Sequence, residues 1–375
     1  MRILELTTYT AGICGVGARV KQEALELSKL GYQVEIFSSN FTKGNNQIAP
    51  SEDKVGNVKI KRFSAKKIGG ESYTSWDFEA EALKFKPDLI IAHAYRHTHT
   101  KLASKVAKQT GAKLFLVTHA PFIENNSTRS FTSKIAVNFY DLFVGPKILK
   151  KFDKIIAITK WEYPYLKKLG VPQEKIVYIP NGIPNEFFKE KIKTFKGKKI
   201  VFLGRISDIK NLETLVKAFQ SISLKNNNIK LKIIGPEEQP YANKIKDLAN
   251  QSKSTIEFLP PIYDLKKKIK TLQETDIFVL PSKREAMPQA LIEAMSLGKI
   301  VISSKTQGGK EIIENGSTGF LFDIGNEKDL ASIIEFCLNK NNKKLIGKIQ
   351  KNARKKSEDF KWSMLIKKLK NLIKK

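Results

Sequence analysis

The sequence predicts an α/β protein with two doubly wound, Rossmann-like domains that face an interdomain cleft. Short apolar runs rich in β-branched residues alternate with helix-length amphipathic segments along the 375 residues. A lysine-rich stretch at 189–198 interrupts this alternation as a linker would, and the pattern restarts near residue 199. Repeated β-α-β spacing predicts parallel sheets covered by helices on both faces, and ligands of such sheets bind beyond the carboxyl ends of the strands.

The expected elements form one series of strands and helices in each domain. In the first domain, 1–185, strands are expected at 2–6, 33–37, 58–63, 88–93, 113–118, 154–158 and 175–179, and helices at 17–30, 75–85, 98–109 and 161–169. In the second domain, 198–358, strands are expected at 199–203, 230–234, 255–259, 277–280 and 299–303, and helices at 212–222, 241–251, 265–271 and 288–297. The final segment, 360–375, has apolar residues at helical spacing with lysines opposite, which predicts an amphipathic helix.

The composition is that of an ordinary globular protein. The hydrophobic fraction is 41% and the charged fraction 28%, and no apolar run approaches the length that a membrane span needs. The first residues, interrupted by Glu5, predict a buried strand and lack the long apolar stretch of a signal peptide. Cys14 and Cys337 lie far apart and outside any metal-binding spacing. We therefore expect a cytoplasmic protein without disulfides.

The net charge of +30 leaves two interpretations open. A basic surface favours polyanionic partners, which include anionic lipid headgroups, phosphorylated substrates and nucleic acid. Alternatively, lysine simply occupies solvated faces throughout the chain. Because the lysines are spread along the sequence instead of gathering with aromatic residues, no nucleic-acid partner is expected.

One segment, 131–151, combines apolar side chains with lysines. Its members are Ile135, Val137, Phe139, Leu142, Phe143 and Ile148, together with Lys134, Lys147, Lys150 and Lys151. Such a segment can lie on an anionic membrane surface, which would make the protein peripheral on the inner face of the cell membrane. The alternative is a helix packed on the core with a solvated basic face.

A glycine turn follows the first strand of each domain. In the first domain Gly15 and Gly17 open a helix, where glycines let backbone amides approach a phosphate or sugar; a tight turn is the alternative. In the second domain, Gly204 is followed by Arg205 and Lys210 at the start of a helix. Two cations beside free helix amides would form a diphosphate clamp, and two solvated surface cations are the alternative.

The strongest local pattern surrounds the helix expected at 288–297. Pro288 suits its first turn, Glu285 lies in the loop before it, and Glu293 lies five residues beyond the proline. Glu285 stands too early for a simple capping role. We expect a carboxylate that accepts sugar hydroxyls beside amides that hold phosphate; a capping acid plus an ordinary helical glutamate is the alternative. The run 307–311, with two glycines, predicts a mobile turn after a strand.

Histidines follow two strands of the first domain. His119 comes directly after the strand expected at 113–118, so it stands at a carboxyl strand end, either as a sugar contact and proton carrier or as a core histidine. His93, His97 and His99 form a cluster without a carboxylate or cysteine partner, which argues against a metal. No Asp-x-Asp pair occurs to hold a divalent cation on a nucleotide diphosphate, so we expect no metal and no cofactor.

Together these residues resemble the family 4 retaining glycosyltransferases of GT-B fold, over nearly the whole chain. The pieces, in family order, are Gly15-Val16-Gly17, 87–93, Thr118-His119, Pro180-Asn181-Gly182, Gly204-Arg205 through Lys210, Glu285 to Glu293, and Gly308-Gly309 through Gly319. The Glu285/Glu293 pair is similar to the family's E-x7-E signature. One departure is Asn211, where many members carry glycine, and it bears on donor preference.

The resemblance implies a metal-independent hexosyltransferase that moves a sugar from a UDP- or GDP-sugar to a lipid-linked, polysaccharide or other cell-envelope acceptor, with retained configuration. It implies that Arg205 and Lys210 hold the diphosphate, Glu293 the ribose and Glu285 the transferred sugar, with His119 near the reacting carbon. The other residues implied at the donor are Gly15, Gly17, Gly204, Ile262, Met287, Pro288, Gln289 and Ala290. The final helix is implied to pack back on the first domain.

A nucleotide-sugar 2-epimerase of related fold is the enzymatic alternative. It would need no acceptor, and the Glu285/Glu293 pattern argues against it. A basic nucleic-acid-binding protein ranks below both enzymes. The identity of the donor, the acceptor and the oligomeric state are not predicted.

Overall fold

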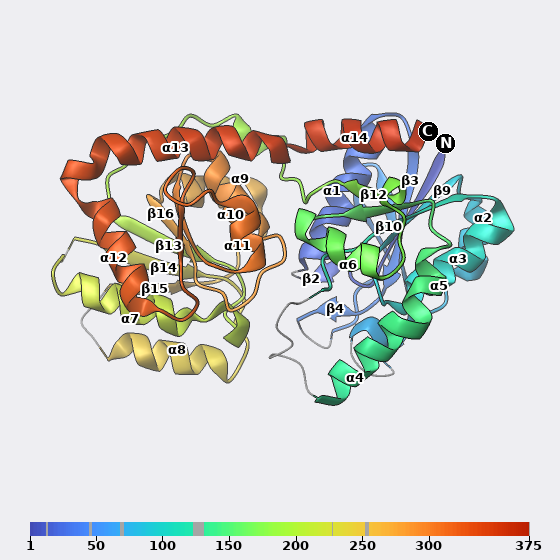
Figure 1. Ribbon diagram of the computed structural model, residues 1–375, viewed down its shortest axis with the longest axis horizontal. Helices are drawn as coiled ribbons and strands as arrows, with labels where there is room; N and C mark the ends of the chain where they lie inside the picture. Colours follow the sequence, from blue (N-terminus) through green and yellow to red (C-terminus); the bar gives the residue numbers. More distant parts are fainter. Residues whose placement is uncertain are drawn as a thin grey trace. The chain divides into compact units, whose positions relative to one another are not determined.

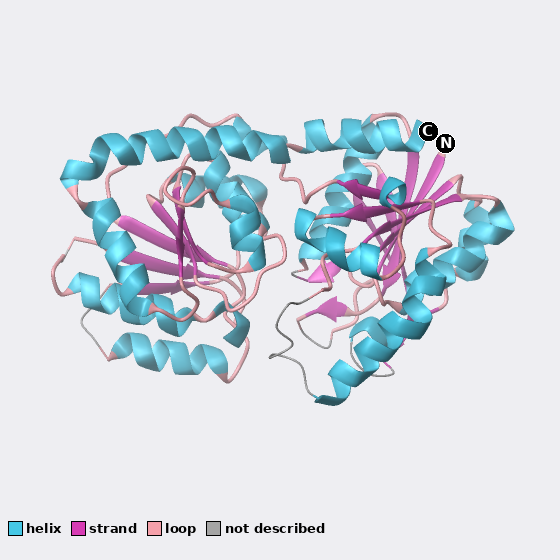
Figure 2. Ribbon diagram, in the orientation of Figure 1, coloured by secondary structure: helices cyan, strands magenta, loops and turns pink. Residues whose placement is uncertain are grey.

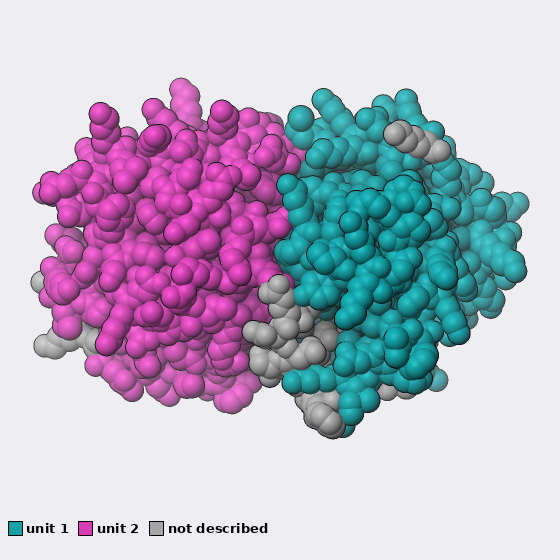
Figure 3. Space-filling model, in the orientation of Figure 1, with its two compact units in different colours: residues 1–182, 362–375 teal, residues 183–361 magenta. Residues whose placement is uncertain are grey.

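The computed structural model describes residues 1–12, 14–44, 47–67, 71–122, 131–226, 228–251 and 255–374. It divides into two compact units, coloured separately in Figure 3. Unit 1 contains Met1–Gly182 and Trp362–Lys375, and unit 2 contains Ile183–Lys361. In each unit a layer of strands has helices on both sides (Figures 1 and 2). The doubly wound α/β prediction is therefore confirmed.

Unit 1 has an eight-stranded sheet in the order β12-β11-β10-β9-β1-β3-β6-β5, parallel except for the β5–β6 pair at one edge. Its strands are β1 (Arg2–Thr7), β3 (Gln33–Ser39), β5 (Glu52–Val55), β6 (Val58–Phe63), β9 (Leu89–His93), β10 (Lys113–Val117), β11 (Lys154–Ala157) and β12 (Ile176–Tyr178). Two small ladders pair β2 (Ala11–Gly12) with β4 (Thr42–Lys43) and β7 (Ala65–Lys67) with β8 (Thr74–Trp76).

The helices of unit 1 are α1 (Gly15–Lys29), α2 (Glu79–Phe85), α3 (Thr98–Thr110), α4 (Phe131–Phe139), α5 (Gly145–Leu149), α6 (Tyr163–Lys168) and α14 (Trp362–Lys374). A π-helical turn, Tyr140–Val144, joins α4 to α5. Within the described residues, no helix has both the length and the apolar character to cross a bilayer.

Unit 2 has a six-stranded parallel sheet in the order β15-β14-β13-β16-β17-β18. Its strands are β13 (Lys199–Leu203), β14 (Lys230–Ile234), β15 (Ile256–Leu259), β16 (Ile277–Leu280), β17 (Ile300–Ser304) and β18 (Phe320–Phe322). Its helices are α7 (Leu212–Ser223), α8 (Tyr241–Asn250), α9 (Leu265–Gln273), α10 (Gln289–Ser296), α11 (Gln307–Ile312), α12 (Glu327–Leu338) and α13 (Lys343–Ser357).

The central strands are apolar along their whole length because helices cover both faces of the sheet. In β9 and β16 every residue is buried, and both read as unbroken apolar runs up to the final His93 of β9. Each aliphatic side chain buried there contributes about 1.5–3 kcal/mol relative to exposure. This explains why these strands stand within a residue of their predicted bounds.

One predicted helix, 75–85, is wrong at its start. Thr74–Trp76 form strand β8, and α2 begins only at Glu79. Thr74 and Trp76 are buried while the residue between them is half-buried, which is the two-residue period of a strand. The stretch 189–198, expected as a linker, lies within unit 2, where the amides of Lys196 and Lys198 donate to the Asp276 carboxylate at 2.9 Å.

The strand order places one crevice position in each unit. In unit 1 the chain winds outward from β1 through β3 and β6, then resumes on the other side of β1 with β9. In unit 2 it winds from β13 through β14 and β15, then resumes beside β13 with β16. Ligands of open parallel sheets bind at such reversals, outside the carboxyl ends of the two diverging strands.

The end of the chain docks in unit 1 through Trp362, the first residue of α14. Helix α14 packs along α1, and the Trp362 ring lies 5.5 Å from the guanidinium carbon of the buried Arg19. A β-carbon on Gly182 would meet three atoms of this ring at 2.7–2.9 Å. Asn181 beside it accepts a hydrogen bond from Arg19 at 3.1 Å. The Pro180-Asn181-Gly182 motif therefore has a packing role here.

Replacing Gly182 with alanine should push the Trp362 ring out of place and lower the free energy of unfolding by about 1–3 kcal/mol, as overpacking of a closed core does. Urea unfolding followed by tryptophan fluorescence measures this. Gly347→Ala is the control, because its β-carbon would meet nothing within 4 Å. A Gly182→Ala protein as stable as the wild type would contradict this account of the motif.

Candidate functional site

In unit 2, the loop after β13 is held against the loop after β14, backbone to backbone. The amide of Gly204 donates to the Ile234 carbonyl at 3.0 Å, and that of Ile206 to the Pro236 carbonyl at 2.8 Å. A β-carbon on Gly235 would lie 1.8 Å from the Gly204 carbonyl oxygen, so only glycine fits there. This packing fixes the direction of Arg205, whose half-exposed guanidinium forms an ion pair with Glu238.

The structure brings Lys210 and Glu285 together at the β13/β16 reversal. The Lys210 Nζ lies 2.5 Å from Glu285 Oε1, and Ser282 Oγ donates to the same oxygen at 2.6 Å. Both charged side chains are largely enclosed, at 18% and 11% exposure, so their pairing is screened less than a surface ion pair. A backbone hydrogen bond from Lys283 to the Ile209 carbonyl at 2.9 Å ties the two loops.

Asn211, the departure from the family pattern, keeps the backbone conformation that glycine would adopt. Its φ is +50° and its ψ +51°, in the left-handed region, where asparagine is the best tolerated residue after glycine. Its side chain donates to Thr214 Oγ1 at 2.8 Å. Asparagine is therefore compatible with the left-handed turn between Lys210 and α7.

The glycines of the run 307–311 are not a mobile turn, and that expectation is wrong. Gly308 and Gly309 are buried in the first turn of α11, which Thr306 caps by accepting the Gly309 amide at 3.0 Å. The Gly308 amide donates to the Glu285 carbonyl at 3.0 Å, and a β-carbon there would meet the Ala286 carbonyl oxygen at 2.6 Å. These glycines let α11 press against the backbone that carries Glu285.

Helix α10 begins one residue later than predicted, with Pro288 at the N-cap position instead of in the first turn. Pro288, as the N-cap residue, provides no side-chain cap. Met287 and Pro288 are buried, whereas Gln289 and Ala290 at its first turn are half-buried. A helix N-terminus without a side-chain cap favours anions through its amides and its dipole.

Glu293, on the buried side of α10, accepts from Lys268 at 2.7 Å through Oε1. Its other oxygen, Oε2, is buried and has no hydrogen-bond partner among the described residues. A buried carboxylate oxygen in this condition favours a donor such as a hydroxyl. Ile262, in the loop after β15, is half-buried.

In unit 1 the loops after β1 and β9 meet through Thr8, whose Oγ1 lies 2.9 Å from His97 Nδ1. Gly17 is required because a β-carbon there would meet the Tyr9 carbonyl oxygen at 2.5 Å, so α1 can approach that loop only with glycine. Gly15, the first residue of α1, borders open space. Gly17 therefore has a packing reason that the motif alone did not reveal.

His119 follows β10 and takes a backbone conformation that is costly for residues other than glycine. Its φ is +58°, that of Ala120 is +48°, and Ala94 and Arg96, after the neighbouring β9, are at +77° and +71°. Each such residue costs of order 1–3 kcal/mol, and such strain gathers at functional sites. These residues lie at neighbouring strand ends of one sheet edge.

Glu162 holds the strained backbone of His119 in place. Its carboxylate is buried and accepts from the Thr118 hydroxyl, from the Ala120 amide at 2.9 Å and from the Ile158 amide at 2.8 Å. Burial raises the pKa of Glu162 to about 7, opposed by these hydrogen bonds. Sequence reasoning missed this residue, although Thr159-x-x-Glu162 is a capping-box signature.

A cavity of about 360 Å³ lies at this edge of unit 1. It is lined by Val16, Ser72, Ala94, Tyr95, Arg96, His97, Thr118, His119, Pro121, Ser133 and Val137. Arg96 is fixed by Asp141, to which its Nε donates at 2.8 Å. The cavity therefore combines a fixed cation and two imidazoles with one polar and one apolar side chain from α4.

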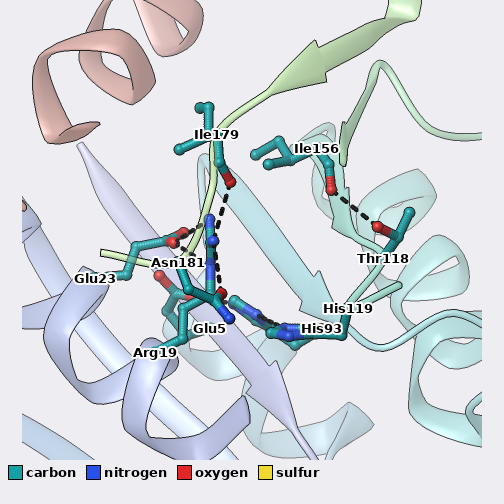
Figure 4. A network of polar contacts seen from close by, with 9 residues as sticks. All are labelled: Glu5, Arg19, Glu23, His93, Thr118, His119, Ile156, Ile179 and Asn181. Atoms are coloured by element: carbon teal, nitrogen blue, oxygen red, sulfur yellow. Dashed lines mark hydrogen bonds and ion pairs between the residues drawn. The ribbon is translucent and has the colours of Figure 1, made fainter. Parts of the chain in front are cut away.

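A sealed polar network lies behind His119 (Figure 4). His93, which ends β9, contacts His119 on one side and Glu5 of β1 on the other. Glu23 of α1 lies next to them, paired with Arg19 at 3.0 Å. The expectation that His93 has no carboxylate partner is wrong, because contacts between β1, α1 and β9 are not visible as a sequence spacing.

Glu5, Glu23 and His93 bring their ligand atoms within 4.8 Å of one another, a grouping that could hold a metal ion. The Arg19 guanidinium already supplies a positive charge to Glu23, which disfavours a second cation beside it. His97 and His99 are not part of this grouping. His97 bonds Thr8, and the His99 ring bonds the His93 carbonyl at 2.7 Å.

Two family models match, one in each half of the chain. Residues 13–187 match "Glycosyltransferase Family 4" and residues 184–356 match "Glycosyl transferases group 1". An uncharacterized glycosyltransferase of Methanocaldococcus jannaschii is 28% identical, over 97% of this chain and 95% of its own. The Escherichia coli UDP-Gal:alpha-D-GlcNAc-diphosphoundecaprenol alpha-1,3-galactosyltransferase is 26% identical, over 73% of this chain and 71% of its own.

Solved structures agree on the fold. Alr3699/HepE of Anabaena, solved in complex with UDP and glucose, superimposes with a TM-score of 0.74 at 18% identity, over 100% of this chain and 99% of its own. The matches to both halves, the full-length relative and the two doubly wound units agree with the resemblance found in the sequence. The chain belongs to the family 4 glycosyltransferases and has the GT-B fold.

Proposed function

We propose that this glycosyltransferase moves a hexose from a UDP- or GDP-sugar to a lipid-linked, polysaccharide or other cell-envelope acceptor, with retained configuration and without a metal. The observation that carries the proposal is the Lys210–Glu285 pair at the β13/β16 reversal of unit 2, with Arg205 in the same loop. Relatives named for UDP-galactose transfer to a diphosphoundecaprenol-linked acceptor and for capsular polysaccharide biosynthesis support the substrate classes.

The departing nucleoside diphosphate develops negative charge, which fixed cations stabilise best. Arg205 offers a planar fork and Lys210 a compact charge, and the uncapped N-terminus of α10 adds oriented amides. These groups supply the positive charge that a divalent metal would otherwise bring. We propose that Gly204 lets the diphosphate approach the backbone and that Gly15 and Gly17 do the same in unit 1.

A phosphate beside Lys210 would compete with Glu285 for the ammonium group. The carboxylate released by this exchange is an acceptor only, suited to hydroxyls of the transferred sugar. We propose the same sugar contact for the amides at 287–290, a ribose contact for Glu293 Oε2 and a base contact for Ile262. His119 would contact the sugar near the reacting carbon.

We further propose that unit 1 docks on an anionic membrane surface through the face formed by α4 and the π-helical turn. Ile135, Phe139, Leu142 and Phe143 are 53–69% exposed, so the core-packed alternative is wrong for them, although Ile148 is buried. Lys147, Lys150 and Lys151, which follow in the chain, are exposed, and Lys134 is half-buried. Apolar residues flanked by lysines fit the boundary between acyl chains and anionic headgroups.

Alanine at Arg205 or at Glu285 should lower kcat/KM for donor turnover about 100-fold or more, because each removes charge stabilisation of the leaving group or orientation of the sugar. Release of the nucleoside diphosphate in the presence of acceptor measures this. Lys283→Ala is the matched control, since Lys283 is a neighbouring cation that pairs with Asp208 on the surface. Unchanged turnover in both folded variants would defeat the assignment.

The donor base should be identifiable by thermal unfolding with UDP, GDP or ADP. A nucleotide at 100 times its Kd adds about 2.7 kcal/mol to the stability of the state that binds it. One nucleotide should raise the Tm well above the others, and this shift should vanish in Lys210→Ala. Equal Tm values with all three at millimolar concentration would contradict a nucleotide site in unit 2.

Membrane docking should be lost when Phe139 and Phe143, whose rings lie 4.9 Å apart, are both replaced by serine. In a flotation assay the wild-type protein should rise with phosphatidylglycerol vesicles, and less of it should do so at high salt. It should not rise with phosphatidylcholine vesicles. Leu224→Ser controls for loss of an exposed apolar residue, at 84% exposure in unit 2. Equal flotation of wild type and double variant would rule out this face.

A further inference from the structure

We propose that Glu5 and His93 form a hydrogen-bond relay that sets the ring tautomer of His119, so that His119 presents its Nδ1–H to the cavity as a donor. This inference rests on the proposed function only in taking His119 as a sugar contact. Glu5 and His93 then act as positioning residues, two steps removed from the substrate.

The relay is continuous across three strands of the unit 1 sheet. Glu5 Oε2 lies 2.6 Å from His93 Nε2, and His93 Nδ1 lies 2.9 Å from His119 Nε2. Glu5 and His93 have no exposed surface, while His119 lines the cavity. Figure 4 shows the three side chains in sequence, with the dashed contact between the two imidazoles. Each ring nitrogen except His119 Nδ1 is therefore committed to a partner within the relay.

With both imidazoles neutral, the hydrogen bonds of the relay can point in only two directions, and each direction fixes which atoms carry the protons. If Glu5 is ionised, His93 Nε2–H donates to it, His93 Nδ1 accepts, and His119 must carry its proton on Nε2. If Glu5 is protonated, its O–H donates to His93 Nε2, His93 Nδ1–H donates to His119 Nε2, and the His119 proton sits on Nδ1. The state of Glu5 thus decides whether His119 offers a donor or an acceptor to a ligand.

The balance of buried charge favours the protonated state of Glu5. Arg19 is the one cation in contact with the network within the described residues, and its Nε and Nη2 both lie 3.0 Å from Glu23 Oε2. The remaining donor of Arg19, Nη1, is taken by the Ile179 carbonyl and Asn181 at 3.1 Å each. A second ionised carboxylate at Glu5 would be buried without a cation, which costs several kcal/mol.

Burial favours the neutral form of both Glu5 and His93. It raises the pKa of Glu5 well above its usual value, opposed by the Arg19 charge. It lowers the pKa of His93 to about 3, so the imidazole does not take the proton from the carboxyl group. The pKa of His119 is likewise held well below its usual value by burial, with His93, Arg19 and His97 adding to the effect. A neutral His119 then acts as a donor through a fixed tautomer and not through charge.

The consequence is a directed N–H at the cavity wall. An isolated neutral imidazole favours the proton on Nε2, so the relay reverses the default. Because Glu162 fixes the backbone at His119, the ring can donate to one oxygen position, a sugar hydroxyl or a phosphate oxygen, without first reorienting. Preorganised donors of this kind are worth most where water is excluded.

Ring ¹⁵N NMR of protein labelled only in histidine tests the proposal directly, since the chain has four histidines. We expect both His93 and His119 as the neutral Nδ1–H tautomer at pH 7. Nε2–H patterns for both residues, or a charged imidazolium at either, would overturn it. A stoichiometric divalent metal that shifts the His93 signals would also overturn it, because a cation would then replace the proton on Glu5.

The variant His93→Leu tests whether His93 sets the tautomer of His119 or only fills space in the core. The His119 signals should move to the Nε2–H pattern, and kcat should fall about tenfold, the value of one hydrogen bond, with KM for the donor little changed. His99→Gln is the matched control, because His99 is also buried and the one hydrogen bond of its ring within the described residues is to the His93 carbonyl. His119 should keep its Nδ1–H pattern in that variant.

A His93→Leu protein in which His119 stays Nδ1–H would overturn the relay whatever its activity. If the tautomers are as expected but no variant alters sugar transfer, the relay stands and the proposed contact between His119 and sugar is what fails. Since the wild-type spectrum decides the tautomer, the test does not depend on the folding of any variant.

Discussion

The buried guanidinium of Arg19 is the constraint around which unit 1 is built. A charge with no exposed surface needs a counter-charge, and Arg19 has Glu23 of its own helix, with further hydrogen bonds to Ile179 and Asn181 after β12. The Arg19 guanidinium lies over the ring of Trp362, so α14 covers this buried charge. Arg19 pairs with Glu23 and, among the described residues, leaves Glu5 without a cation. The proton that we propose on Glu5, and the direction of the hydrogen bond between His93 and His119, follow from this pairing.

Unit 2 reaches its arrangement by close packing of backbone instead of burial of charge. Gly235 allows the loops after β13 and β14 to touch at their main chains, and Gly308 allows the first turn of α11 to touch the loop after β16. The side chains between them have little freedom left. Lys210 and Glu285 meet there although 75 residues separate them. The strand-order reversal selects the position, the glycines bring the loops together, and the ion pair is the result.

The sequence was sufficient for whatever is periodic or local. The buried strands β9 and β16 stand within a residue of their predicted bounds, and Arg205, Lys210 and Glu285 stand at strand ends as strand-to-helix spacing requires. What it could not supply were contacts between distant elements: the pairing of Glu5 with His93 across 88 residues, or the packing of Gly182 on Trp362. The short strand β8 was missed because its alternation of buried and half-buried residues, over three residues, cannot be recognised before the structure shows which side chains are buried. The capping signature at Thr159 was present in the sequence, but no other motif drew attention to that loop.

The two units therefore hold their charges in ways suited to different tasks. The ion pairs of unit 2 keep some exposed surface, and each joins one cation to one carboxylate. On the proposed function an incoming diphosphate replaces the carboxylate at small cost, since the ammonium or guanidinium trades one anion for another. The network of unit 1 is sealed, and none of its bonds can be exchanged without burying an unpaired group. On the proposed function, charge in unit 2 follows the nucleotide as it arrives and leaves, whereas charge in unit 1 cannot move and so can only fix geometry. The sugar transfer that we propose needs both, because the leaving group must be neutralised as it departs while the sugar is held in a single orientation.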